Sequence, residues 1–252
     1  MRTVALGYLA VLLLVPVGLV FWRTFQHGIA PVWSSITTPA AIHAFWLTVE
    51  VAAIAVPLNA IFGVVAALAI VRGRFAGKPL LDALIDLPFA VSPVVIGLSL
   101  VLVFGRTGWL AHLPFQVIFS VPGIVLATIF VSLPFVAREV VPVLREIGDE
   151  QEQAALTLGA SGWQTFWRIT LPSIRWGLVY GVVLATARAI GEFGAVSVVS
   201  GRIAGQTETL TLLVQRRFEN FDLAGAYAAS ALLAIIALAT LLAMTVIRRR
   251  PA

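Results

Sequence analysis

Two ionisable residues lie within an otherwise apolar stretch of this sequence, at a spacing that suits an ion pair. Arg188 and Glu192 are four residues apart in the segment from Trp176 to Val199, so on a helix they share one face. At 1.5 Å of rise per residue, Arg188 lies roughly 18 Å from Trp176. Charges at such a depth are costly, and they usually pair and face a protein interior or a water-filled path. The pair therefore either lines a path or gate for a charged solute or orients its helix against neighbouring helices.

Other residue types that carry chemistry are sparse. The three histidines, His27, His43 and His112, have no metal-ligand spacing, and the chain contains no cysteine. We therefore expect no metal site, and disulfide and thiolate chemistry are excluded.

A nucleotide site is not expected on this chain. The nearest approach to a phosphate-binding loop is Gly77-Lys78, but Arg72 replaces its first glycine and Pro79 its final serine or threonine. Any process driven by ATP must therefore use a partner protein.

The composition indicates whether water or lipid surrounds the protein. Of 252 residues, 60% are hydrophobic and 12% charged, and the mean hydropathy is +1.00. A soluble domain is roughly 45–50% apolar and about 25% charged. The sequence therefore predicts an integral membrane protein, and its net charge of +5 is too thinly spread to suggest nucleic-acid binding.

Six segments approach the roughly 20 apolar residues that a membrane-spanning helix needs. We expect an all-α protein with one transmembrane domain over residues 1–252, a six-helix bundle in a multi-pass cell-membrane protein. The predicted spans are 4–21, 45–71, 80–104, 117–141, 176–199 and 223–247.

The positive charges predict the orientation of these spans. With both termini in the cytoplasm, eleven Lys and Arg residues lie inside and five outside, and Arg188 falls within a span. Because cytoplasmic loops carry an excess of Lys and Arg, we expect both termini to be cytoplasmic. The eleven are Arg2, Arg72, Arg74, Lys78, Arg138, Arg145, Arg168, Arg175, Arg248, Arg249 and Arg250, and the five are Arg23, Arg106, Arg202, Arg216 and Arg217.

Two spans contain features that bear on helix shape and packing. Pro88 and Pro93 in the third span each remove a backbone donor, which predicts kinks suited to a moving pathway, although proline is also common in membrane helices. The fifth span carries a small residue every four positions, which lets another helix approach closely. These residues are Gly177, Gly181, Ala185 and Ala189.

The longest polar stretch is the loop between the fourth and fifth spans, residues 142–175. Asp149 is a candidate cap for a first short helix, and Gly159 a candidate for its end. Ser161 and Gln164 have the spacing of a capping box, and Pro172 is expected to end the second helix. A loop of this form either docks on another protein or rests on the membrane surface.

Trp163, Phe166 and Trp167 are predicted to share one face of the second loop helix. The loop also resembles the "EAA" loop of ABC importer permeases, which reads EAA, three residues, Gly, and later I-x-L-P. The matching residues are Gln153, Ala154, Ala155, Gly159, Ala160, Phe166, Ile169, Leu171 and Pro172. Gln153 stands at the position of the family's glutamate, with Glu152 beside it.

This resemblance implies a function for the loop. In that family the loop supplies a coupling helix that sits in a groove of the cytoplasmic ATPase. The resemblance therefore implies a type I ABC importer permease, without enzymatic activity, that works with two copies of an ATPase holding ATP-Mg. It also implies a substrate-binding protein on the outer side.

A second resemblance concerns the transported substrate. The segment 188–201, which contains Gly191-Glu192-Phe193-Gly194-Ala195, resembles the W-type permease subunit of sulfate and thiosulfate importers, and 87–97 resembles the same group. It implies sulfate and thiosulfate as substrates and a heterodimer with a T-type permease. A molybdate or tungstate importer is the nearest alternative.

Two further alternatives belong to other classes. Asp82 and Asp86 share a helix face and could act as an intramembrane protease pair, although they stand in a segment that resembles an ordinary loop region of the permease family. A stand-alone channel would leave the loop at 142–175 without a purpose.

Overall fold

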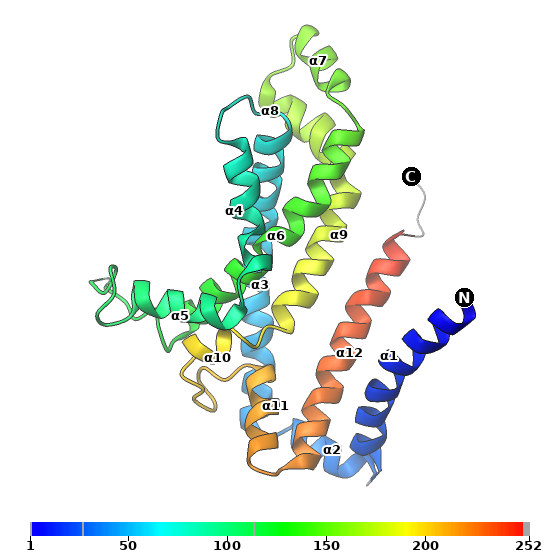
Figure 1. Cartoon of the computed structure of the whole chain (residues 1–252), viewed down its shortest axis with the longest axis vertical. Helices are drawn as coiled ribbons and strands as arrows, with labels where there is room; N and C mark the ends of the chain where they lie inside the picture. Colours follow the sequence, from blue (N-terminus) through cyan, green and yellow to red (C-terminus); the bar gives the residue numbers. More distant parts are fainter. Residues whose placement is uncertain (1, 27, 113, 249–252) are drawn as a thin grey trace.

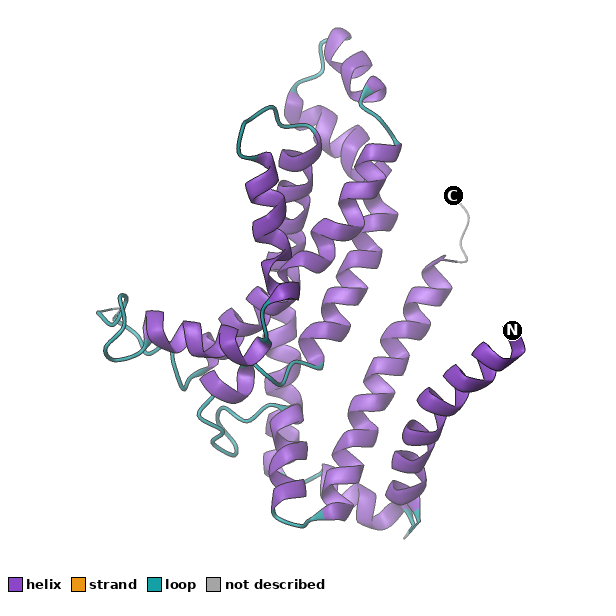
Figure 2. Cartoon of the chain, viewed as in Figure 1, coloured by secondary structure: helices purple, strands orange, loops and turns teal. Residues whose placement is uncertain are grey.

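The computed structural model describes residues 2–26, 28–112 and 114–248, and their regular elements are all helical (Figure 2). The α-helices are α1 (Arg2–Phe25), α2 (Ile29–Ile36), α3 (Pro39–Val71), α4 (Lys78–Ala90), α5 (Pro93–Phe104), α6 (Val121–Glu146), α7 (Glu150–Thr157), α8 (Gly162–Thr165), α9 (Leu171–Ile190), α10 (Val196–Val199), α11 (Leu210–Glu219) and α12 (Leu223–Arg248). A π-helix, η1 (Phe166–Thr170), joins α8 to α9.

Helices α3, α6 and α9 form the core of the bundle (Figure 1). Their shared apolar cluster includes Ala67, Val136, Leu144, Ile174 and Ala185, all of which are buried. Lipid is as apolar as these side chains, so close packing rather than exclusion from water must hold the helices together.

Small residues allow that close packing. A Cβ added to Gly63 of α3 would lie 2.7 Å from the Cβ of Val136, and one added to Gly181 of α9 would lie 2.8 Å from the Cα of Val136. A Cβ added to Gly177 of α9 would likewise lie 3.0 Å from the carbonyl oxygen of Glu139 on α6. The predicted small-residue face of the fifth span is therefore confirmed, and it packs against α6.

The third predicted span, 80–104, is two helices rather than one kinked helix. Helices α4 and α5 meet at an angle of 110° across the break between Ala90 and Pro93. Pro88 lies inside α4, whereas Pro93 begins α5, where its missing N–H would have no intrahelical partner. The predicted kink at these prolines therefore takes the form of a break between two helices.

The number of spans depends on how the bent helices are counted. Four helical stretches are long and apolar enough to cross a membrane alone, and six result if each of two bent pairs counts as one span. The single stretches are Pro39–Val71, Val121–Glu146, Gly162–Ile190 and Leu223–Thr240, and the bent pairs are Ala10–Phe25 with Ile29–Ile36 and Lys78–Ala90 with Pro93–Phe104.

Figure 1 shows the arrangement of the two ends of the bundle. Helices α1 and α12 pack beside each other, and α1 starts and α12 ends toward the side on which α7 and α8 lie. The opposite end of the bundle holds α2 and α11.

Charged side chains of α11 hold this opposite end together. Arg217 donates from Nη2 to the carbonyl oxygen of Ser35 at 2.8 Å and from Nη1 to that of Gly225 at 3.0 Å. Burial lowers the pKa of Arg217, whereas a hydrogen bond to the buried Glu208 raises the pKa of Arg216. Helix α11 also buries Leu210, Leu212 and Leu213, so one of its faces packs into the bundle.

Candidate functional site

The loop after α6 forms a short helix, a glycine turn and a second helix, as predicted. The N–H of Ala160 donates to the carbonyl of Ala155, and that of Gly159 donates to the carbonyl of Leu156, both at 3.0 Å. These two bonds make a Schellman motif, which needs a left-handed residue at its turn. Gly159 supplies it with φ of +90°, so the prediction that Gly159 ends α7 is confirmed.

The start of the second helix is also as predicted. Ser161 accepts a hydrogen bond from the N–H of Gln164 at 3.3 Å, and the Gln164 side chain accepts from the N–H of Ser161 at 2.9 Å. This is a complete capping box.

Two details of the loop were predicted wrongly. Asp149 makes no side-chain cap because its ψ of 5° lies outside the extended region that a capping residue adopts. Pro172 does not end the second helix, which continues to Ile190. The N–H of Leu171 bonds the carbonyl of Phe166 through a π-turn, and Pro172 falls in the first turn of α9, where a missing N–H is tolerated.

Glu152 is the charged residue of the loop that the structure ties to the bundle. Its Oε2 accepts a hydrogen bond from Nε of Arg72 at 2.9 Å, and its Oε1 accepts from Oγ1 of Thr170 at 2.7 Å. The neighbouring Gln153 and Ala154 are exposed, and Ala155 and Ala160 are half-buried. The residue beside the family's glutamate position therefore bonds within this chain.

The same loop presents an apolar surface, defined by Leu156, Leu158, Trp163 and Trp167. Leu158 is 88% exposed and Trp163 is 70% exposed. Trp163, Phe166 and Trp167 contact one another with ring centroids 5.5–6.1 Å apart, Trp163 stacked on Phe166 and Trp167 edge-on to both, so they share a face as predicted. Phe166 and Leu171 anchor this face on the core cluster.

Arg188 and Glu192 form the predicted ion pair, but not on one continuous helix. Nη1 of Arg188 lies 2.6 Å from Oε2 of Glu192. Helix α9 ends at Ile190, so the expected span 176–199 is wrong over its last part. The helix stops because the other oxygen of Glu192 accepts the N–H of Ala195 at 2.8 Å and closes a turn that leads to α10.

The environment of the pair differs between its two members. The Glu192 side chain is 2% exposed and that of Arg188 is 31% exposed. Thr48, Thr128 and Thr209 line the same small cavity as Glu192. The carboxylate of Glu192 is therefore enclosed by protein, and the guanidinium of Arg188 is the more accessible member of the pair.

The break in the third span lies beside this turn. A Cβ added to Gly194 would lie 2.8 Å from the Cβ of Pro93, and one added to Gly97 would lie 2.8 Å from the carbonyl oxygen of Ala195. The structure thus brings Pro93 close to the segment that carries Glu192. Pro88 is buried elsewhere, on α4.

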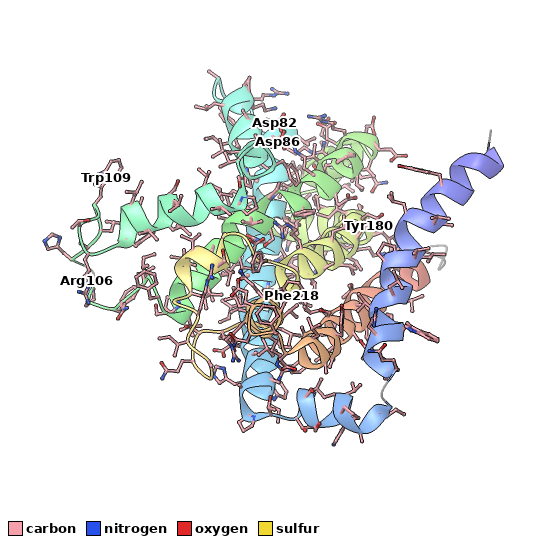
Figure 3. All side chains as sticks on the ribbon, turned by 60° about the horizontal axis from the view of Figure 1, so that its bottom comes forward. Asp82, Asp86, Arg106, Trp109, Tyr180 and Phe218 are labelled. Carbon is pink, nitrogen blue, oxygen red and sulfur yellow. The ribbon has the colours of Figure 1, made fainter. Side chains whose placement is uncertain are left out.

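Asp82 and Asp86 form a separate cluster with one cation. Figure 3 shows the two carboxylates close together on α4. Nη2 of Arg138 lies 2.9 Å from Oδ1 of Asp82, and Nε of Arg138 donates to Oδ1 of Asp86 at 2.6 Å. The shared arginine ties α4 to α6, so the geometry gives both carboxylates a packing role.

The structure adds functional candidates that the sequence reasoning missed. Arg72 and Arg138 were counted as positive charges for the orientation and were not paired with an acid, and Thr170 was not singled out. The acidic partners of Arg72 and Arg138 are 52 to 80 residues away in the chain, so no local spacing connects them. Among the described residues, no group of three or more His, Cys, Asp or Glu side chains is arranged to hold a metal ion.

We expect Glu192→Ala to destabilise the protein more than Glu192→Gln. The first change leaves both the Arg188 guanidinium and the Ala195 N–H without a partner, a loss of about 3–5 kcal/mol for the broken buried pair and about 1 kcal/mol for the hydrogen bond. Thermal unfolding of the purified protein in detergent measures the difference. Glu192→Gln, which can still accept the Ala195 N–H, serves as the control and should unfold at a temperature between those of Glu192→Ala and the unchanged protein. Equal melting temperatures for Glu192→Ala and Glu192→Gln would contradict the role of the turn.

Comparison with known proteins places this geometry in a family. A family described as "Binding-protein-dependent transport system inner membrane component" matches residues 59–251. The sulfate transport system permease protein CysW of Synechocystis sp. is 50% identical over 250 residues, which cover 98% of this chain and 91% of the relative. CysW of Escherichia coli (strain K12) is 49% identical over 96% of this chain and 84% of the relative. The sulfate transport system permease protein CysT of the same strain is 41% identical over 95% of this chain and 88% of the relative.

Solved structures agree at the level of the fold. A chain of a bacterial ABC transporter involved in the import of the acidic polysaccharide alginate superposes with a TM-score of 0.80 at 17% identity, covering 98% of this chain and 93% of that one. A chain of the bacterial alginate transporter in complex with its alginate-bound periplasmic protein superposes with a TM-score of 0.78 at 16% identity. The match covers 99% of this chain and 93% of that one. Since the family match spans most of the chain, this multi-pass membrane protein belongs to the inner membrane components of binding-protein-dependent transport systems.

Proposed function

We propose that this chain is a transmembrane subunit of an ATP-driven importer of sulfate, and also of thiosulfate. The observation that carries the proposal is the identity of about half of all residues, over almost the whole chain, to proteins named as sulfate transport permeases. The 188–201 segment, by which the sequence resembles W-type sulfate permeases, forms the turn that carries Glu192. No observation on this chain favours molybdate or tungstate.

The proposed architecture is that of a type I importer permease, with six spans in one transmembrane domain and both termini in the cytoplasm. The excess of positive charge on one side supports this orientation. The direction of α1 and α12 relative to α7 and α8 supports it as well (Figure 1).

The proposed power source is a pair of ABC ATPases that bind ATP-Mg and dock on the loop from α7 to η1. The exposed apolar surface at Leu156, Leu158, Trp163 and Trp167 supports this, because an exposed cluster of large apolar side chains is typical of an interaction site. The family's coupling residues correspond to Glu152, Gln153, Ala154, Ala155, Gly159, Ala160, Phe166, Leu171 and Pro172.

The other proposed partners are a T-type permease, which forms a heterodimer with this chain, and a substrate-binding protein. The 41% identity to CysT of Escherichia coli supports the first, since paralogous subunits of one importer are expected to share their fold. The similar fold of an alginate transporter that was solved with its periplasmic protein supports the second.

The translocation pathway or its gate is proposed to lie at the turn around Arg188 and Glu192, next to the α4–α5 break marked by Pro88 and Pro93. The partly exposed guanidinium of Arg188 can offset the charge of a passing dianion, while Glu192 holds that guanidinium in place. Irregular backbone at membrane depth is tolerated where it is buried in protein or lines a cavity.

The substrate is tested in a host strain that has no other sulfate importer. The chain is expressed with a binding protein, a T-type permease and an ATPase from its own source, and uptake of radiolabelled sulfate is measured. We expect uptake and growth without cysteine, both lost when this chain is left out, and unchanged molybdoenzyme activity. Uptake of molybdate in place of sulfate would contradict the assignment.

Gly159→Val should uncouple the loop from the ATPase. A β-branched residue at φ of +90° costs about 1–2 kcal/mol, which corresponds to roughly a 5–30-fold loss of the native turn. We expect a similar fall in sulfate uptake at normal membrane levels of the chain. Gly162→Val is the matched control, because Gly162 has an ordinary φ and open space around it, and it should transport normally.

Single cysteines test the orientation, since the natural chain has none. A cysteine at Gln164 or Arg74 should be protected from a membrane-impermeant thiol reagent in intact cells, whereas one at His112 or Gln206 should react. All four positions are exposed, so burial does not explain protection. The reverse labelling pattern would refute cytoplasmic termini.

A further inference from the structure

Arg72 joins three parts of the chain at the end of the bundle that carries the loop. It directly follows α3, and its Nε donates to Oε2 of Glu152 on α7 at 2.9 Å. Its Nη2 also donates to the carbonyl oxygen of Gly148, two residues after the end of α6. One guanidinium thus connects the ends of α3 and α6 to α7.

Glu152 extends this connection to α9. Its second oxygen accepts from Oγ1 of Thr170 at 2.7 Å. Thr170 is buried and is the residue before α9. Both carboxylate oxygens of Glu152 are therefore used inside the chain, and 16% of its side chain is exposed.

The rest of α7 is weakly held. Its described contacts with other helices are mainly with α8 and η1, which belong to the same loop, and none of its residues is fully buried. The bonds of Arg72 are therefore what attaches α7 to α3.

We propose that Arg72, Glu152 and Thr170 form a junction through which displacement of the loop reaches α3, α6 and α9 together. This inference rests on the proposed docking of an ATPase on the loop. It assigns Glu152 to positioning within the chain, and it leaves docking to the apolar surface at Leu156, Leu158, Trp163 and Trp167.

The physical basis is the partial burial of the pair. An exposed ion pair contributes little, because water and salt screen it. Arg72 and Glu152 are 23% and 16% exposed, and each has a further hydrogen bond. Removing either partner leaves the other charge partly buried without compensation, so the loop should detach from α3.

The experiment compares Arg72→Ala, Glu152→Gln and the double variant in the complete transporter, reconstituted in vesicles. Arg74→Ala is the matched control, because Arg74 is an exposed arginine two residues away that forms no ion pair with another residue that the structure describes. Sulfate uptake, ATP hydrolysis and co-purification of the ATPase are measured. We expect the ATPase to co-purify with every variant and uptake per ATP to fall at least about ten-fold in each single variant. The double variant should be no worse than the more impaired single one, and Arg74→Ala should match the unchanged protein.

Three outcomes would overturn the junction. Loss of the ATPase from Glu152→Gln, with Arg72→Ala unaffected, would mean that Glu152 contacts the ATPase. Multiplying losses in the double variant would mean that the residues act separately. Unchanged sulfate uptake per ATP in Arg72→Ala and in Glu152→Gln would mean that the junction transmits nothing.

A readout that needs no ATPase separates this inference from the proposed function. Hydrogen exchange of the purified chain should be faster in the amides of α7 in Arg72→Ala than in Arg74→Ala, by at least about five-fold. If the unchanged chain binds no ATPase while this difference is present, the proposed function fails and the junction stands. If exchange is unchanged, the junction fails.

Discussion

Helix α6 lies between α3 and α9, and at Val136 the glycines of both neighbours bring their backbones against it. Gly63 approaches from α3 and Gly181 from α9, and a single added methyl group at either position would meet Val136 at less than 3 Å. In a membrane, apolar side chains gain nothing by leaving lipid for protein, so fit and contact decide association. Helices α4, α5, α10, α11 and α12 contact this three-helix core, and α1 and α2 lie against α12.

The interruptions of the helices follow from that attachment. Irregular backbone at membrane depth is tolerated only where protein or a cavity covers it. The break between α4 and α5 and the turn after α9 cover each other, with Gly97 close to Ala195 and Pro93 close to Gly194. Glu192 satisfies the N–H of Ala195 within the turn. A buried charge and two helix breaks therefore meet at one place in the bundle.

On the side of the bundle toward α7 and α8, ion pairs rather than close backbone packing join the elements. There, single arginines join elements that are far apart in sequence, Arg72 from the end of α3 and Arg138 from within α6. Arg138 holds α4 to α6 through Asp82 and Asp86, and Arg72 holds α7 to α3 through Glu152. Helix α7 is thereby attached to α3, although its other contacts lie mainly within the loop.

The sequence by itself determined the membrane environment, the helical class and the local form of the loop. Gly159 and the Ser161–Gln164 pair could be interpreted correctly because turns and caps depend on neighbours within a few residues. The spacing of Gly177 and Gly181 predicted a packing face for the same reason. The close relatives then supplied the family that the EAA pattern had suggested.

Only the tertiary structure decided where helices break and which charges pair. Whether Pro88 and Pro93 bend a helix or flank a break depends on what covers the exposed backbone, and α10, about a hundred residues away, provides that cover. The end of α9 at Ile190 depends on a carboxylate that turns back onto the following backbone. Arg72 and Glu152 are 80 residues apart, and no local pattern links them, because packing of α3 against α6 and α9 sets the distance between them.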